Sequence, residues 1–224
     1  MERHTFLSVL IFTLVLLAVG IMLPSGQVDR PVGLPWQIEQ TERGSIRVFG
    51  IELAHTTLGE AELAFREPSK ATLFAPEQGD YTIEAYFNET RLSGLKAKMV
   101  FTFDLEQTQV REMYDRGIRI STLGSGTRKV TLHPDDYEQL RKSAIATLTY
   151  IPSINLESEL VAQRFGQPAA RIRDPEGGAI HWLYPELGVD VVLSEEAKEV
   201  LQYLPPSQFD RVMAPLQTAG EVVN

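Results

Sequence analysis

The chain has 224 residues, of which 43% are hydrophobic and 23% are charged, and it carries a formal net charge of −9 and no cysteine. This length and composition are enough to bury a core, which excludes a wholly disordered protein. The acidic balance disfavours nucleic acid and anionic lipid head groups as partners. Without cysteine the chain has neither a disulfide framework nor the acceptor of a lipoprotein anchor.

An uncharged apolar run extends from Phe6 to Leu23. At 1.5 Å per residue it is about 27 Å long as a helix, close to the hydrocarbon thickness of a bilayer. The run predicts a transmembrane anchor over residues 1–23. The alternative is a signal peptide cleaved after Ala18-Val19-Gly20, although this small-x-small site lies inside the run. Cleavage there would release a secreted soluble binding protein.

The cations that flank the apolar run indicate its orientation. Arg3 precedes the run, whereas the first cation after it is Arg30. The positive-inside rule therefore places the N-terminus in the cytoplasm and the rest of the chain outside. We expect a single-pass inner-membrane protein with its C-terminal domain in the periplasm.

A linker and a first α+β unit follow the anchor. Residues 24–44 contain three prolines and three glycines, which favour a linker whose far end docks on the domain through Trp36 and Ile38. Residues 45–117 show strand alternation, then a helix capped by Thr56 or Thr57 and ended by Pro68. Three further strands and a helix complete this unit, at 70–75, 81–89, 95–105 and 106–117.

A connecting segment and a second unit complete the chain. Residues 118–150 predict a strand, a helix that begins near Pro134 and another strand. Residues 151–224 repeat the order of the first unit and add a short helix over 207–213. The repeated elements are a helix at 155–168, strands at 169–174, 179–186 and 188–194, and a helix at 195–204.

The two units are related by a spacing of 100 residues. "FREP" at 65–68 and "FGQP" at 165–168 end the first helix of each unit, and three predicted strands follow in both. The predicted fold class is therefore α+β: an N-terminal transmembrane helix followed by a periplasmic domain of two helix-plus-antiparallel-sheet units.

The helix, the "FGQP" turn and the aromatic-rich strand after it resemble the small α+β modules of the β-lactamase inhibitor protein and of lipoproteins that assist outer-membrane protein assembly. The resemblance covers residues 46–105 and 150–195. It implies a sheet face that binds partner proteins, with no catalytic residue to carry over. The chain departs from the lipoprotein pattern because it lacks the lipid-bearing cysteine. As a whole it resembles an uncharacterised family of membrane-anchored bacterial envelope proteins.

The sequence contains no strong signature of catalysis. No two of its four histidines have metal-ligand spacing, and no Gly-x-Ser-x-Gly nucleophile elbow is present. The glycine-rich "LGSGTRK" at 123–129 lacks the ending of a phosphate loop and predicts a turn. We therefore predict no catalytic residue, no metal site and no cofactor.

The strand "AIHWLYPE" at 179–186 offers the most informative candidate side chains. Alternation places Ile180, Trp182 and Tyr184 on a core face and His181 and Leu183 on the opposite face. We expect the His181 ring to be half exposed. If that second face is open, His181 and Leu183, together with Trp36 of the linker, are the predicted partner-binding residues.

These observations favour binding over catalysis. We expect the periplasmic domain to bind or scaffold another envelope protein or a membrane complex. The alternative is a periplasmic hydrolase whose site is assembled from dispersed residues such as His133, Asp135, His181 and Tyr184. A deep pocket that gathers two of these would favour the hydrolase, and a sheet face without convergent polar groups would favour binding.

Overall fold

The computed structural model describes residues 33–92, 95–175, 177–194 and 196–223, all within one compact unit, Pro31–Asn224. The predicted anchor and residues 24–32 of the predicted linker lie outside these residues. Within them, no helix has both the length and the apolar character needed to cross a membrane. The predicted α+β class is confirmed, and strands contribute more residues than helices.

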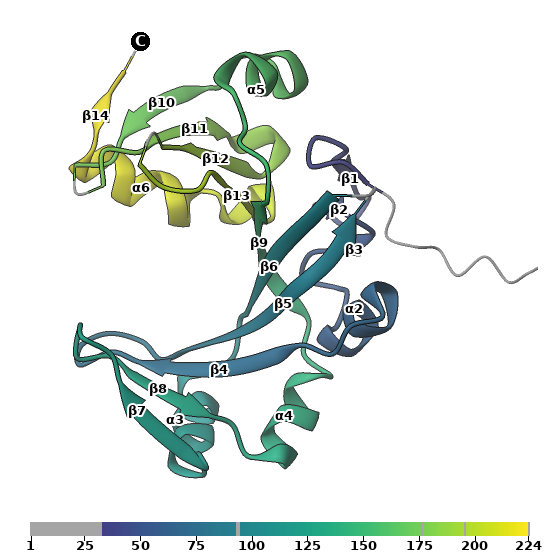
Figure 1. Cartoon of the computed structure of the whole chain (residues 1–224), viewed down its shortest axis with the longest axis vertical. Helices are drawn as coiled ribbons and strands as arrows, with labels where there is room; N and C mark the ends of the chain where they lie inside the picture. The colour runs from purple at the N-terminus through teal and green to yellow at the C-terminus, as the bar shows by residue number, and fades with distance from the viewer. Residues whose placement is uncertain (1–32, 93–94, 176, 195, 224) are drawn as a thin grey trace, which may run out of the picture. The chain divides into compact units, whose positions relative to one another are not determined.

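Eleven strands form one antiparallel sheet in the order β14-β10-β11-β12-β13-β9-β6-β5-β4-β8-β7 (Figure 1). The strands are β4 (Lys70–Ala75), β5 (Thr82–Leu92), β6 (Leu95–Phe103), β7 (Arg119–Thr122), β8 (Arg128–Thr131), β9 (Ile145–Pro152), β10 (Ala170–Arg173), β11 (Ile180–Tyr184), β12 (Val189–Leu193), β13 (Val200–Tyr203) and β14 (Glu221–Val222). The predicted turn at 123–129 is confirmed, because it joins β7 to β8 in a hairpin.

A separate small sheet precedes the large one. It contains β1 (Glu39–Gln40), β2 (Ile46–Val48) and β3 (Ile51–Glu52). The single strand predicted near 45–53 is thus a hairpin. Its turn holds Phe49 and Gly50 at φ angles of 52° and 79°, a left-handed conformation that breaks the alternation of buried residues.

Five helices are described: α2 (Leu58–Phe65), α3 (Gln107–Asp115), α4 (Pro134–Leu140), α5 (Ser158–Phe165) and α6 (Asp210–Ala219). Two short 3₁₀ turns accompany them, η1 (Pro185–Leu187) and η2 (Pro206–Gln208). The Thr57 hydroxyl accepts from the Glu60 amide, and the Glu60 carboxylate accepts from the Thr57 amide, so α2 begins with a complete capping box. This explains the predicted helix start.

The two halves of the large sheet share a central strand. The N-terminal half comprises β4–β9 with α2, α3 and α4, and the C-terminal half comprises β10–β14 with α5 and α6. Each half contains a helix followed by three consecutive antiparallel strands. Strand β9 comes from the predicted connecting segment and pairs with both β6 and β13, so it joins the halves into one sheet.

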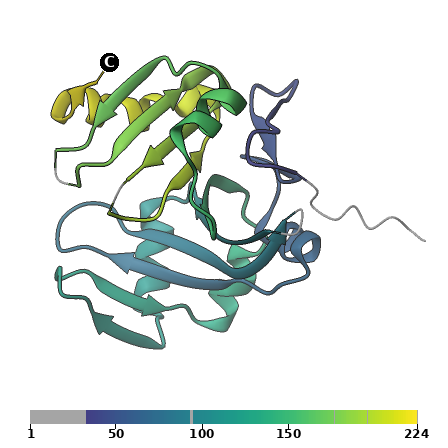
Figure 2. The same cartoon turned by 45° about the horizontal axis from the view of Figure 1, so that its top comes forward.

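The inner face of this sheet packs on the main hydrophobic core. Helices α2, α3, α4 and α5 contribute apolar side chains to that core, including Leu58, Val110, Leu140 and Val161. The opposite, outer face has a second core in the C-terminal half alone, where α6 packs on Ile172 and Leu183. Helices α5 and α6 therefore lie on opposite sides of the C-terminal strands (Figure 2).

One predicted element at the C-terminus is wrong and another is displaced along the chain. The helix predicted over 195–204 is replaced by β13, which fills the gap between β12 and β9 and buries Leu201 and Tyr203 completely. The β-propensity of Val200 and Tyr203 and the burial that the sheet provides outweigh the helix propensity of the preceding residues. The predicted short helix begins three residues later, as α6, and the tail forms β14 against β10.

Candidate functional site

The structure tests the face predicted to bear His181 and Leu183. Alternation along β11 is confirmed, because Trp182 and Tyr184 join the main core and Leu183 joins the second core. The outer face is closed here, since α6 packs over it. Leu183 is fully buried, so it does not contribute to an exposed docking surface.

His181 is paired and mostly buried, so the expectation of a half-exposed ring is wrong. Its side chain is 16% exposed, and its Nδ1 lies 2.7 Å from Oδ2 of Asp190, whose side chain is 1% exposed. Burial alone would lower the pKa of His181, but the hydrogen bond and charge of Asp190, aided by the charge of Asp174, raise it. Burial raises the pKa of Asp190. We interpret the pair as a polar link between β11 and β12 under α6.

Trp36, the third predicted binding residue, is partly buried in the N-terminal segment. The Arg164 guanidinium of α5 lies 4.8 Å from its ring centroid. The predicted docking of the linker is supported by neighbouring contacts: Ile38 packs on the main core, and the buried Tyr203 hydroxyl donates to the Pro35 carbonyl at 2.9 Å. Trp36 thus contributes to holding this segment on α5.

The residues named for a hydrolase do not converge. His181 and Tyr184 project from opposite faces of β11. His133 caps α4, where its Nδ1 accepts from the Asp135 amide at 3.3 Å, and six strands of the sheet separate β8 from β11. Within the described part of the chain, no group of His, Asp and Glu side chains has the arrangement of a metal site.

The N-terminal half presents a different outer face, which we call the open face. Strand pairing aligns rows of side chains across it, and one row contains Lys70, Tyr86, Val100 and Thr149. None of these four belongs to either core, and each is partly or fully exposed. No described helix contributes an apolar residue to this face, in contrast to the outer face of the C-terminal half.

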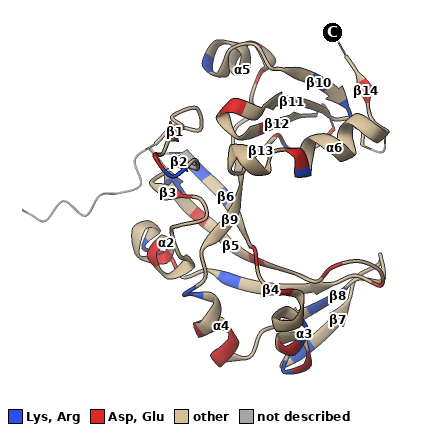
Figure 3. Cartoon of the chain, turned by 180° about the vertical axis from the view of Figure 1, so that it is seen from behind, with Lys and Arg blue, Asp and Glu red and all other residues tan. Residues whose placement is uncertain are grey.

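The open face is basic. Strand alternation and pairing place on it six exposed cations: Lys70, Arg91, Lys96, Lys98, Arg119 and Lys129. Blue segments on β4, β6 and β8 mark part of this set (Figure 3). Along the regularly paired strands we find one carboxylate, Glu84, which accepts a hydrogen bond from the Tyr86 hydroxyl. Burial and Glu84 raise the pKa of Tyr86, so its hydroxyl stays neutral at physiological pH.

Hydroxyl and apolar groups lie among these cations. Threonines from five strands belong to the open face: Thr72, Thr82, Thr102, Thr131, Thr147 and Thr149. The Thr102 and Thr147 hydroxyls are 2.6 Å apart and link β6 to β9. Phe74, Val100 and Ile151 are half-buried between neighbouring strands and pack against neither core. The surface therefore combines hydrogen-bonding groups, flat apolar contacts and positive charge.

Sequence reasoning missed the open face although its signal is visible in the sequence. In "LKAKMVFTF" and "IATLTYI" the buried residues alternate with lysines and threonines, which is typical of a sheet with one uncovered face. The strands were predicted, but the sequence did not show that α6 covers the outer face of one half alone.

Comparisons with known proteins found no relative of this chain. No family model matches the chain, and neither the curated proteins nor the solved structures include a significant match.

Proposed function

We propose that this chain is a membrane-anchored envelope protein whose folded domain binds another protein through the open face. The proposal assigns the domain a scaffolding role without bond-making chemistry. The observation that carries it is the concentration of six cations on an uncovered sheet face of a protein whose net charge is −9.

Charge complementarity defines the partner. A basic surface attracts a negatively charged one and fixes its orientation, while the acidic remainder of this domain repels the same partner. We therefore infer that the partner presents Asp and Glu side chains to the open face. The six threonines supply hydroxyls that donate to carboxylates and backbone carbonyls at such an interface.

The apolar groups of the open face favour a protein over a bilayer surface. Phe74, Val100 and Ile151 are half-buried between strands. Proteins that bind the membrane interface insert large apolar side chains into it, whereas a protein partner packs closely against a pleated surface. The acidic remainder of the chain also disfavours extended contact with anionic lipid or nucleic acid.

The proposed location is the periplasmic side of an inner membrane. It is supported by the charge-free length of Phe6–Leu23 and by Arg3 before it, both of which are properties of the sequence outside the described residues. An anchored domain needs little affinity to find a partner in the same membrane, because tethering raises their effective concentration.

Site-specific photo-crosslinking in intact cells tests the proposal. We would place a photoreactive amino acid at Thr149 on the open face and, as a control, at Leu63, which is 73% exposed on α2. We expect a protein adduct from position 149 alone. The double substitution Lys70→Glu/Lys98→Glu should abolish the adduct.

A matched charge reversal distinguishes specific docking from net charge. Lys142→Glu/Arg43→Glu changes the total charge equally at exposed positions outside the open face and should leave the adduct unchanged. Adducts of position 149 with lipid or nucleic acid, or equal adducts at both positions, would overturn the proposal.

A further inference from the structure

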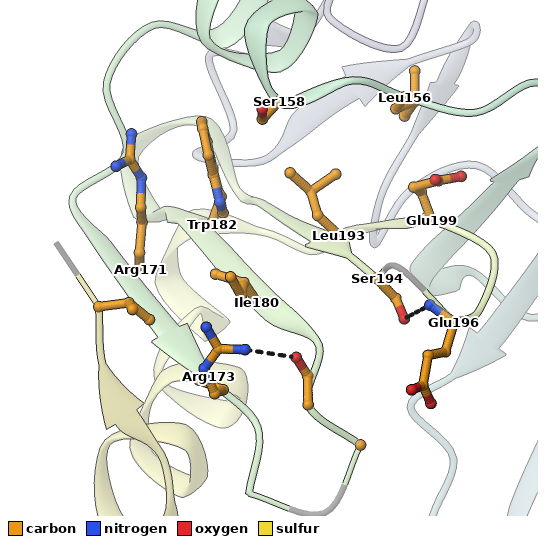
Figure 4. A pocket seen from close by; sticks show the side chains of 13 residues that line it. Leu156, Ser158, Arg171, Arg173, Ile180, Trp182, Leu193, Ser194, Glu196 and Glu199 are labelled. Atoms are coloured by element: carbon orange, nitrogen blue, oxygen red, sulfur yellow. Dashed lines mark hydrogen bonds between the residues drawn. The ribbon is translucent and has the colours of Figure 1, made fainter.

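A groove on the inner face of the C-terminal half is distinct from the open face. It has a volume of 830 Å³ and lies between strands β10–β12 and the segment that leads into α5 (Figure 4). Its apolar lining comprises Trp182, Ile180, Leu193, Leu156 and Val223. A volume of this size is typical of small-ligand sites, and the remaining lining residues are polar, charged or glycine.

One boundary of the groove is a buried carboxylate without a partner. Glu199, just before β13, is 7% exposed, and its Oε2 is buried without a hydrogen bond. The adjacent Lys198 directs its ammonium elsewhere and donates to the Asn155 side-chain oxygen at 3.2 Å. A buried carboxylate without a partner costs folding free energy, so its retention requires an explanation.

The other buried carboxylates show that this fold normally provides partners. Glu62 accepts from the Arg141 guanidinium at 2.7 Å, and Asp136 accepts from Arg116 at the same distance. Asp190 pairs with His181. Among the carboxylates that the structure describes as buried, Glu199 alone has no partner within the protein.

The opposite side of the groove is cationic. Arg171 and Arg173 project from β10, two residues apart and therefore on the same face. The Arg171 guanidinium lies 4.1 Å from the ring centroid of Trp182, and its buried Nε makes no hydrogen bond. Stacking on the indole fixes the planar guanidinium in position, which prepares it to bind a carboxylate. Figure 4 shows Trp182 and Leu193 between Arg171 and Glu199.

We propose that this groove binds a short peptide segment that carries both an amine and a carboxylate. The ammonium group donates to Glu199, the carboxylate accepts from Arg171 and Arg173, and the intervening apolar side chains lie on Trp182. The site does not depend on the open face, because the two lie on opposite faces and in different halves of the sheet.

Tryptophan fluorescence of the full-length chain in detergent tests this assignment. The chain has two tryptophans, so the Trp36→Phe variant reports on Trp182 alone. The probe is the peptide acetyl-Lys-Leu-Leu with a free C-terminal carboxylate. We expect a saturable change in emission. Acetylation of the probe's lysine or amidation of its C-terminus should each weaken binding about tenfold or more, as expected for a lost charge-assisted hydrogen bond.

Two variants and one further probe make the test decisive. Glu199→Gln should weaken binding about tenfold or more, with an unchanged or higher melting temperature because the substitution removes a buried unpaired charge. Glu186→Gln, an exposed position outside the groove, should bind like the parent protein. The proposal would be overturned if the emission change did not saturate with added peptide. It would also be overturned if Glu199→Gln bound the peptide as tightly as the parent protein, or if that variant melted several degrees lower. Spermidine binding as tight as the peptide would show that the carboxylate plays no part and would also contradict it.

Discussion

The two halves of the large sheet begin with the same order of elements but differ in how their outer faces are covered. In the C-terminal half, α6 packs on Ile172 and Leu183, and the polar groups beneath it form the His181–Asp190 pair. In the N-terminal half no described helix packs there, and lysines and threonines occupy the equivalent positions. The difference suggests a division of roles, in which one half is stabilised on both faces and the other leaves a face free for a partner.

The largest expected effect is the loss of a core side chain from the closed half. Trp182 is 7% exposed and belongs to the main core on the inner face, with the Arg171 guanidinium 4.1 Å from its ring centroid. Trp182→Ala should lower the free energy of unfolding by about 3–5 kcal/mol, as is typical of a large aromatic residue truncated in a core. Urea denaturation would measure this. A loss below about 1 kcal/mol would show that the indole is not a core residue.

The next effect concerns the buried pair under α6. His181→Ala leaves the Asp190 carboxylate, 0% exposed, without its partner. We expect a loss of about 3 kcal/mol, the lower end of the range for breaking a buried ion pair. Because Asp190→Asn removes the buried charge, adding it to His181→Ala should recover part of the loss. Equal stability of His181→Ala and the parent protein would contradict the closed outer face.

A smaller effect is the dependence of stability on pH. The folded-state pKa of His181 is raised above 6.5. Its contribution is therefore fully present below pH 6.5 and is lost as the pH rises through the folded-state pKa. The raised pKa of Asp190 acts in the same direction. Denaturation measured from pH 6 to pH 9 tests this. As the pH rises, the free energy of unfolding of the parent protein should fall more than that of the Asp190→Asn variant. A difference that stays constant over this range would contradict the raised pKa.

The smallest effect is expected on the open face. Val100 packs against neither core, so Val100→Ala should change the free energy of unfolding by about 0.5 kcal/mol or less, as for most surface substitutions. Thermal melts of this variant and of Trp182→Ala, run side by side, measure the contrast between the halves. Comparable losses would show that the open face is covered in the folded protein.

Local sequence patterns predicted most elements but not the way they cover the sheet. Capping and proline signals located α2, α4 and α5, and alternation located the strands of both repeated units. The segment that forms β13 has the composition of a helix, and its strand depends on the gap between β12 and β9. Such tertiary effects are not visible in a window of ten residues.

The candidate sites were less predictable than the fold. His181 was placed on the correct face of β11, but its burial depends on α6, which begins 29 residues later. Glu199 gave no signal, because a carboxylate in a predicted helix is normally solvent-exposed. To predict the open face, one would need to know which strands lack a covering helix. That follows only from the three-dimensional arrangement.

Chemical labelling of the open face tests the central claim most directly. Because the chain has no cysteine, Val100→Cys and the control Leu63→Cys each introduce one thiol. Both should react with a membrane-impermeant maleimide in the purified full-length protein. In intact spheroplasts the periplasmic side of the inner membrane is exposed to the reagent. There we expect the thiol at position 100 to be protected from labelling and the thiol at position 63 to be labelled as in the purified protein. Equal labelling of position 100 in the purified protein and in spheroplasts would contradict the claim that a partner occupies this face.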